Sequence, residues 1–103
     1  MIVADATAHE IRQIVREAVV NAAKHAHASA VSVEIRQENE QLHVVVVDDG
    51  HGFPFHGKYS DADRRRLRVG PVVLAERVDA LGGSLGIESS TSGARLNIRI
   101  PLA

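Results

Sequence analysis

The chain has 103 residues, of which 12 are basic and 13 acidic, giving a formal net charge of −1. This length suits one domain, and the balanced charge supplies no field that would recruit nucleic acid or an acidic membrane surface, so neither partner is expected. The lack of cysteine excludes disulfides and thiolate metal sites. No apolar run reaches the roughly 18 residues of a membrane span, and aromatics make up only 3%. The core must therefore be aliphatic, and stacking of nucleic-acid bases is not expected.

A long helix is the first predicted element, from about Ala8 to about Ala28. Thr7-Ala8-His9-Glu10 has the form of a capping box, which predicts the start of this helix. The segment Met1–Ala6 is interpreted as the end of a preceding element. Apolar side chains recur at the helical spacing and predict one buried stripe: Ile11, Ile14, Val15, Ala18, Val19 and Ala22.

Two strands follow and are expected to form a hairpin. Residues 31–35 alternate apolar and polar side chains, which predicts a half-buried strand, and residues 38–41 form a polar turn. Residues 42–47 are the second strand, whose run of four valines indicates a position in the core. This dry strand ends at two carboxylates, Asp48 and Asp49, which are followed by Gly-His-Gly. A simple turn would need only one aspartate and one glycine.

The second half of the chain begins with an irregular segment, His51–Val69, which predicts a long loop with at most one helical turn. Such loops are usually functional or mobile, and we expect this one to be unordered without a ligand, because few apolar residues anchor it. A second helix is predicted from Gly70-Pro71 to Gly82-Gly83, followed by strands at 84–89 and 94–100. The element order predicts an α+β fold, a two-layer sandwich with one mixed sheet covered by helices on one face.

A polar stripe flanks the apolar face of the first helix, formed by Glu17, Asn21, Lys24 and His25. Two interpretations are open. The stripe is either a solvated face with Glu–Lys pairs, or a phosphate site. In a phosphate site, the Asn21 amide oxygen suits Mg²⁺, Lys24 offers a charge for phosphate oxygens, and Glu17 can hold a water or accept a proton.

Four separated motifs occur in order: EAVVNAAKHA, VVDDGHGF, GPVVLAERVDALGG and SGARLNIRIPL. Together they resemble the ATP-binding catalytic domain of bacterial two-component sensor histidine kinases, nearest the subgroup of nitrate and desaturase sensor kinases. These belong to the ATPase superfamily shared with gyrase, heat-shock chaperones and mismatch-repair proteins. The resemblance covers about residues 10–102, and it implies the two-layer ATP-binding fold of that superfamily.

The resemblance implies a role for each matching residue. Glu17 would be the catalytic residue that assists the phosphate acceptor, Asn21 would bind Mg²⁺, and Asp48 would accept a hydrogen bond from the adenine amino group. A buried carboxylate also discriminates against guanine, whose carbonyl would leave it unpaired. The implied ATP-binding set is Asn21, Lys24, His25, Asp48, Gly50, Gly52, Phe53, Gly70, Val72, Gly93 and Ala94.

The segment His51–Val69 would be the ATP lid. Its arginines, Arg64, Arg65, Arg66 and Arg68, either supplement phosphate binding or form a solvated face, and both interpretations are open. The chain also departs from the family pattern. Val73 replaces a common glycine and Pro71 lacks an N–H donor, which weakens the phosphate site. Ala94 replaces a common threonine near the adenine.

The implied function is to bind Mg-ATP and donate its γ-phosphate to a histidine on a separate dimerisation segment of a sensor kinase, with a response regulator as the indirect partner. We expect the dimerisation and sensor segments to be absent from this chain, which would then be a cytoplasmic monomer unable to autophosphorylate alone. The alternative is a non-catalytic nucleotide-binding or partner-binding module with a degenerate ATP site. A metal site formed by His51 and His56 beside the two aspartates is a lesser alternative, because a turn and a lid explain the same residues.

Overall fold

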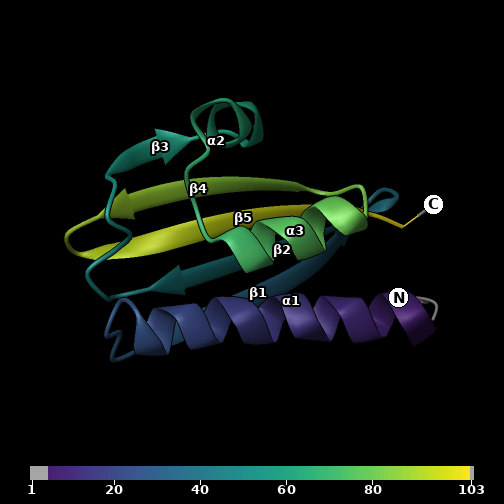
Figure 1. The fold of residues 1–103 in the computed structure, drawn as a ribbon. Helices are drawn as coiled ribbons and strands as arrows, with labels where there is room; N and C mark the ends of the chain where they lie inside the picture. Colours follow the sequence, from purple (N-terminus) through teal and green to yellow (C-terminus); the bar gives the residue numbers. More distant parts are fainter. Residues whose placement is uncertain (1–4, 103) are drawn as a thin grey trace.

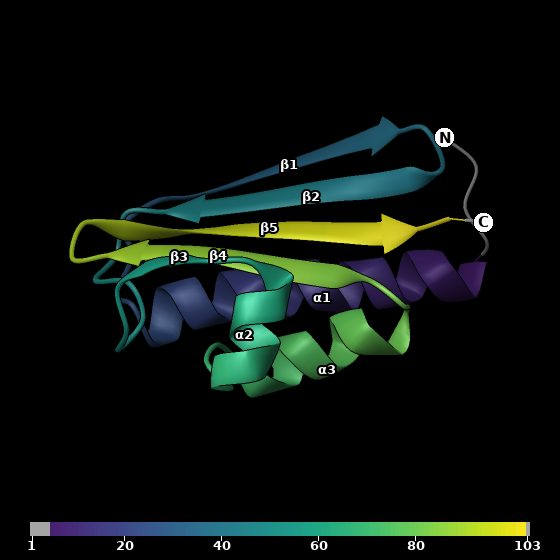
Figure 2. The same cartoon turned by 90° about the horizontal axis from the view of Figure 1, so that it is seen from above.

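The computed structural model describes residues 5–102 and contains three helices and five strands. In chain order they are α1 (Asp5–Lys24), β1 (Val31–Glu38), β2 (Gln41–Asp48), β3 (Gly57–Tyr59), α2 (Asp61–Leu67), α3 (Val72–Ala80), β4 (Ser84–Ser90) and β5 (Gly93–Pro101). Helices α1 and α3 lie side by side on one face of the sheet, and α2 lies beside β3 and β4 (Figures 1 and 2). The predicted two-layer α+β architecture is confirmed.

The strands follow the order β1-β2-β5-β4-β3, and all four pairings are antiparallel. The expectation of a mixed sheet was therefore wrong for residues 5–102. Two tight turns join β1 to β2 and β4 to β5, and such turns can connect only antiparallel neighbours. The connection that carries β3, α2 and α3 then places β5 antiparallel beside β2. In this register Asp48, at the tip of β2, lies opposite Ala94 of β5.

The core lies between the sheet and the two long helices and is aliphatic, as the composition predicted. Alternate residues of each strand face the helices, because successive side chains of a strand point to opposite faces. The strands contribute Leu42, Val44, Val46, Leu85, Ile87, Leu96, Ile98 and Ile100, and the helices contribute Ile11, Ile14, Ala18, Leu74 and Val78. The same alternation places Asp48 on the helix side of the sheet, two residues after Val46.

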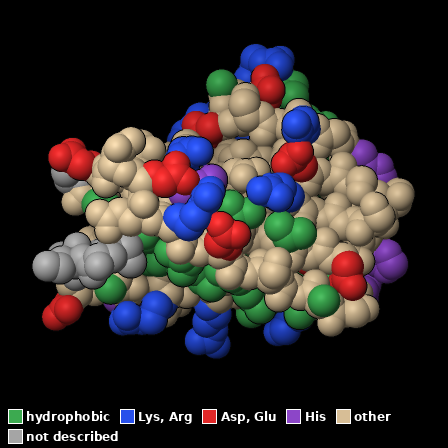
Figure 3. Space-filling view, turned by 180° about the vertical axis from the view of Figure 1, so that it is seen from behind, with side chains coloured by type: hydrophobic (Ala, Val, Ile, Leu, Met, Phe, Trp, Pro, Cys, Tyr) green, Lys and Arg blue, Asp and Glu red, His purple; other side chains and the backbone are tan. Residues whose placement is uncertain are grey.

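The opposite face of the sheet is polar. Arg36 contacts Glu34 and Glu38 at 3.1 and 3.2 Å, and Arg99 lies 3.8 Å from Glu38. Figure 3 views the molecule from the side of the sheet that α1 and α3 do not cover, and acidic and basic side chains are interspersed over this side. The pattern is that of an antiparallel sheet with one solvated face. None of the helices within residues 5–102 is long and apolar enough to cross a membrane.

Helix α1 begins earlier and ends earlier than predicted. It already includes Asp5, so Thr7 lies inside the helix and the predicted capping position was wrong; residues 1–4 lie outside the described part of the chain. The helix ends at Lys24 rather than near Ala28, because His27 takes a left-handed conformation (φ 54°) that an α-helix cannot contain. The predicted strands are confirmed, with ends shifted by a few residues.

The segment His51–Val69 is not one long loop, since it contains β3 and α2. A capping box starts α2: the Asp63 N–H donates to Ser60 Oγ at 3.1 Å, and the Ser60 N–H donates to the Asp63 carboxylate at 3.4 Å. The S-D-A-D sequence carried this signal. Side chains at both ends of this short pattern therefore define a helix that apolar spacing did not reveal.

Polar contacts, rather than apolar ones, hold α2 against the rest of the fold. Asp61 accepts hydrogen bonds from the Leu85 N–H of β4 (2.8 Å), from Arg64 (2.9 Å) and from Arg65 (2.8 Å). Arg64 is buried, and its Nε donates to the Leu85 carbonyl at 3.2 Å. Arg65 also pairs with Asp79 of α3. The expectation of a segment without anchors overlooked this cluster.

Burial raises the pKa of Asp61, but hydrogen bonds from Arg65, the Leu85 N–H and Arg64 outweigh it and lower that pKa from 3.8 to about 2. Asp61 therefore stabilises the fold above its unfolded-state pKa, and this contribution is lost as the pH falls towards about 2. We predict that Asp61→Asn lowers the free energy of unfolding by about 2 kcal/mol at neutral pH, because the buried Arg64 loses the nearer of its two carboxylate partners.

Urea unfolding measured from neutral pH down to acid would check this prediction. The difference between wild type and variant should shrink as the pH falls from 3.8 to about 2, because this carboxylate is protonated first in the unfolded chain and then in the folded protein. Glu40→Gln, at an exposed carboxylate of the β1–β2 turn, is the matched control and should show no such dependence. A difference that does not change with pH would contradict the assigned role of the Asp61 charge.

Candidate functional site

A cleft of about 640 Å³ opens between the C-terminal half of α1 and the tips of β2 and β5. The segment from Gly52 to Phe55 and the segment from Arg68 to Pro71 form its other walls. Seven of the predicted site residues line it: Asn21, His25, Asp48, Gly52, Phe53, Gly70 and Ala94. The structure thus brings residues from four separate motifs into one cavity.

The other five predicted site residues do not line the cleft. Glu17 is half-buried on α1, one turn before Asn21, and Lys24 is exposed at the end of that helix. Val72, at the start of α3, is 68% exposed. Gly50 and Gly93 lie behind the wall and support it. The helical spacing placed Lys24 on the same broad face as Asn21, but the spacing alone could not show how far the cleft extends along α1.

Asp48 is the last residue of β2, and it lines the cleft. Its Oδ1 accepts the Gly50 N–H at 2.8 Å, which fixes the carboxylate at the turn. No other hydrogen bond to this carboxylate forms among residues 5–102, so its second oxygen is available to a donor in the cleft. The side chain is half-buried, and a ligand amine placed here would meet a carboxylate acceptor, the stronger kind of hydrogen-bond partner.

Asp49 turns away from the cleft and does a different job. Its Oδ1 accepts the backbone N–H groups of Ser29 (2.8 Å) and Ala30 (3.0 Å), in the connection between α1 and β1. The hydrogen bonds from Ala30 and then Ser29 lower the pKa of this carboxyl group. The two consecutive aspartates are thus divided: Asp48 faces the cavity, and Asp49 ties the end of α1 to the tip of β2.

Two glycines allow the backbone to pack closely behind Asp48. A Cβ on Gly50 would collide with the Ala26 carbonyl oxygen, and one on Gly93 would collide with the Asp48 carbonyl oxygen. Gly93 also has φ 149°, which disfavours other residues. The wall of the cleft therefore depends on close backbone contacts that only glycine permits.

All three aromatic side chains of the protein form one cluster beside the cleft. The Phe53 and Phe55 rings are stacked, with centroids 5.2 Å apart and planes 9° apart, and Tyr59 meets Phe55 edge-on at 5.1 Å. The Phe53 N–H donates to the buried Ser89 Oγ at 2.8 Å, which fixes the base of the stack. Sequence analysis missed Phe55 as a cleft residue, although the spacing F-P-F places two phenylalanines next to Asp48.

The lid arginines divide into two groups. Arg64 and Arg65 pair with Asp61 and Asp79, and Arg66 lies 3.4 Å from Asp63. Arg68 follows the end of α2 and lines the cleft. The interpretation as a solvated face does not hold for Arg64, which is buried, and phosphate binding by Arg68 stays a prediction.

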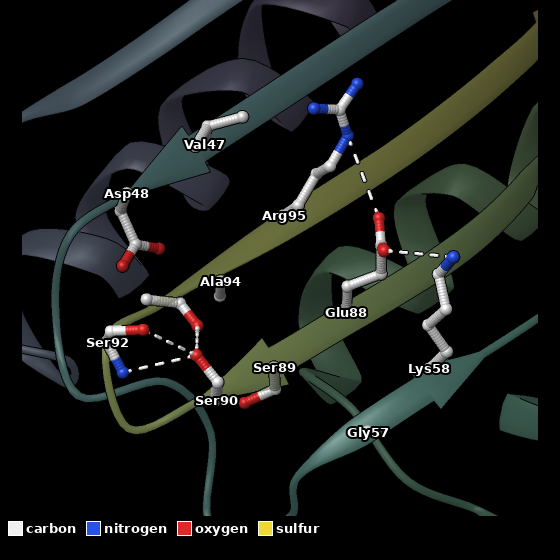
Figure 4. Close-up of a pocket in the computed structure, with 11 residues that line it drawn as sticks. Val47, Asp48, Gly57, Lys58, Glu88, Ser89, Ser90, Ser92, Ala94 and Arg95 are labelled. Atoms are coloured by element: carbon white, nitrogen blue, oxygen red, sulfur yellow. Dashed lines mark hydrogen bonds and ion pairs between the residues drawn. The ribbon is translucent and has the colours of Figure 1, made fainter.

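A second hollow, of about 550 Å³, lies on the solvated face of the sheet and shares Asp48 with the cleft (Figure 4). There Glu88 lies between Lys58 (3.5 Å) and Arg95 (3.7 Å), so the charges of the hollow compensate one another. It is open to solvent and lacks an aromatic wall. The cleft on the helix side is the better candidate for a ligand, because it has an apolar wall of Phe53 and Phe55 and no ion pair fills it.

The histidines do not build a metal centre in the described part of the chain. His27 and His51 are neighbours, with ring centroids 5.7 Å apart, but no group of three His, Asp or Glu side chains converges within residues 5–102. The backbone N–H of His51 donates to the Ala26 carbonyl at 2.8 Å, so this residue helps to close the turn after β2.

Known proteins are similar to this chain in both sequence and fold. The profile of the family described as histidine kinase-, DNA gyrase B-, and HSP90-like ATPase matches residues 6–103. The signal transduction histidine-protein kinase/phosphatase UhpB of Salmonella typhimurium is 38% identical over 89 residues, covering 86% of this chain and 16% of that protein. Sensor histidine kinase YdfH of Bacillus subtilis is 34% identical over 99 residues, covering 93% and 23%.

Solved structures agree. The histidine kinase domain of the blue-light activated histidine kinase EL346 from Erythrobacter litoralis superimposes with a TM-score of 0.66 at 32% identity, over 93% of this chain and 48% of that one. The ATP-binding domain of PrrB from Mycobacterium tuberculosis gives 0.69 at 26% identity, over 92% and 68%. This chain belongs to the histidine kinase-, DNA gyrase B-, and HSP90-like ATPase family. Within that family it is similar to the ATP-binding domains of sensor histidine kinases, which confirms the resemblance. The chain spans less than a quarter of the length of UhpB and of YdfH.

The packing behind Asp48 yields a prediction. Gly50→Ala should lower the free energy of unfolding by about 2 kcal/mol, because the new methyl group collides with the backbone of Ala26 and the end of α1 must shift. Gly86→Ala is the matched control on the solvated face, where the nearest atom to a new Cβ is 3.5 Å away. Chemical unfolding of both variants would check this, and equal stability of the two would disprove the close packing at Gly50.

Proposed function

We propose that the cleft binds Mg-ATP, and that in a full-length sensor kinase this domain donates the γ-phosphate to a histidine on a separate dimerisation segment. One observation carries the proposal: Asp48, from the tip of β2, and Asn21, from α1, line the same cavity. The carboxylate suits the amine of an adenine, and the amide suits a magnesium ion on the phosphates. A response regulator would be the indirect partner, and the cytoplasm would be the site of action.

The adenine would lie at the Asp48 end of the cleft. The free oxygen of that carboxylate accepts a hydrogen bond from an exocyclic amine, whereas a guanine carbonyl in the same place would leave the oxygen unpaired. Phe53 and Phe55 supply an apolar wall for a planar base, and Ala94 of β5, which pairs with Asp48, also lines the cleft. The hydroxyl that a threonine would offer at position 94 is missing, so recognition rests more heavily on Asp48.

Asn21 fits a magnesium ion through the chemistry of its side chain. Mg²⁺ prefers hard oxygen ligands and usually keeps several waters, so one amide oxygen beside the phosphates suffices. The bound ion would neutralise phosphate charge during transfer. Glu17 lies one helical turn before Asn21, so we propose that it acts at the rim by accepting the proton of the attacking histidine.

The start of α3 contributes to the phosphate end. Val69, Gly70 and Pro71 line the cleft, and the first N–H groups of the helix point along its axis towards that wall. Pro71 stands at the N-cap and offers no donor. The remaining catalysis is positioning, because phosphoryl transfer requires aligned partners and charge stabilisation rather than covalent chemistry from the protein.

We predict that Asp48→Asn weakens the binding of Mg-ADP by roughly 10- to 100-fold, because the amine of the base loses a charged acceptor. Isothermal titration calorimetry would measure this. Asp49→Asn is the matched control, since it removes the same charge one residue away and retains an oxygen for the N–H groups of Ser29 and Ala30. If the two variants bind ADP equally well, the assigned adenine position is incorrect.

The magnesium role gives a separate prediction. Asn21→Ala should weaken ATP binding in the presence of Mg²⁺ by roughly tenfold, but should change it little in EDTA, because only the metal-dependent part of the affinity passes through this side chain. Asn21→Asp keeps a hard oxygen ligand and should retain the metal dependence. Calorimetric titration of the three proteins with and without Mg²⁺ would check it. A loss of affinity by Asn21→Ala that is equal in EDTA would show that the amide contacts the nucleotide directly.

A further inference from the structure

Strand β1 forms a long, unprotected edge of the sheet. It stands at the end of the strand order, and among residues 5–102 no strand pairs with its outer side. All eight of its residues pair with β2 in one uninterrupted register, and its sequence VSVEIRQE contains neither proline nor lysine. The opposite edge, β3, is only three residues long. Natural sheets usually shorten, bulge or charge an edge strand to prevent further pairing, and β1 carries charges only on its solvated face.

The free backbone groups of this edge belong to residues with apolar side chains. Opposite residues of an antiparallel pair alternate between pairs that exchange hydrogen bonds and pairs that do not. The Asp49 N–H donates to the Ala30 carbonyl at 3.3 Å, so the even-numbered residues of β1 are those that bond to β2. The N–H and C=O groups of Val33 and Ile35 therefore point away from β2, towards the open edge.

An apolar groove of about 390 Å³ runs beside this edge, between α1 and β1. Val33 and Ile35 lie opposite the buried Val46 and Val44, so their side chains are on the helix face of the sheet, yet they remain 38% and 45% exposed. In Figure 3, hydrophobic side chains form a band along the lower part of the molecule, with basic side chains beneath it. The apolar lining of the groove consists of Ile11, Val15, Val19 and Val20 of α1 and Ile35 of β1.

We infer that the edge of β1 is a self-association surface, on which a second copy of this chain pairs its own β1 in the antiparallel direction. The two sheets then continue into one, and the outward N–H and C=O groups of Val33 and Ile35 gain partners. The two grooves merge, and the stems of Arg12 and Arg16 on their rims cover apolar surface while the guanidinium groups stay in water. This inference departs from the monomer that the sequence led us to expect.

The charges on the solvated face favour a second copy as the occupant, and they select one register. The outward groups of two copies meet only when odd-numbered residues lie opposite odd-numbered residues. With Ile35 opposite Ile35, Glu34 of each copy lies opposite Arg36 of the other, and opposite charges across a strand pair are stabilising. Centring the pairing on Glu34 or on Arg36 instead places identical charges opposite each other. The strand is therefore self-complementary about Ile35, as a two-fold interface requires.

Sedimentation velocity over a range of protein concentrations tests this inference. The average mass of the wild type should rise with concentration towards twice that of the monomer, and the amide exchange of Val33 and Ile35, followed by NMR, should slow in parallel. Ile35→Lys should abolish the rise, because it places a charge on the apolar face of the edge. Leu67→Lys is the matched control, since Leu67 is an aliphatic residue of α2 with a similar exposure of 47%, and it should associate as the wild type does.

Two charge reversals test the register. Glu34→Arg alone would place arginine opposite arginine, and Arg36→Glu alone would place glutamate opposite glutamate. Each variant should therefore need roughly tenfold more protein to associate. An equimolar mixture of the two variants should recover association, because every arginine of one copy then lies opposite a glutamate of the other. Thermal unfolding of each variant would verify that the fold is intact.

Three results would overturn the inference. They are a wild type that stays monomeric at every concentration, charge variants that associate alone as well as they do together, and association that leaves the amides of Val33 and Ile35 unprotected. The test is independent of the proposed nucleotide site, because the groove and the cleft share no lining residue. Ile35→Lys should accordingly bind Mg-ADP with the affinity of the wild type.

Discussion

The fastening of the end of α1 to the tip of β2 is the constraint on which the candidate site depends. Asp49 binds two N–H groups of the α1–β1 connection, the His51 N–H binds the Ala26 carbonyl, and Gly50 leaves room for this contact. These contacts set the separation between the helix that carries Asn21 and the strand that carries Asp48. Without them both side chains would still exist on a folded core, but no cavity of defined width would lie between them.

The lid illustrates how a short segment can be placed with few apolar contacts. The buried guanidinium of Arg64 donates a hydrogen bond to the Leu85 carbonyl of β4. The Asp61 carboxylate accepts hydrogen bonds from Arg64 and from the Leu85 N–H. Each partner satisfies the other, so the desolvation of the charges is compensated. This arrangement leaves the next residues of the lid free to serve the cleft. The structural contacts of the lid are therefore made by Arg64 and Arg65, whereas Arg68 lines the cleft.

The sequence predicted the aliphatic core, the first hairpin and the position of Asp48 at a strand end, because period-two alternation and a run of valines report directly on burial. It did not predict the two turns of α2, since the apolar spacing is absent. The information lies in a capping box and in contacts to distant residues, Arg65 with Asp79 and Asp61 with the Leu85 N–H, which are 14 and 24 residues apart. It placed Lys24 in the site because helical spacing cannot show where a cleft ends. The mixed sheet failed because strand direction depends on long-range pairing, which local patterns do not contain.

The aromatic stack beside the cleft has an optical consequence. The protein contains one tyrosine and no tryptophan, and Tyr59 closes the stack that begins with Phe53 at the cavity wall. Its hydroxyl donates to the His56 carbonyl, within the same short segment. The ultraviolet emission of the whole polypeptide therefore arises mainly from a single ring, which contacts the cavity-lining Phe55. A change in the packing of Phe55 would alter the surroundings of this intrinsic chromophore, with no dye attached to the chain.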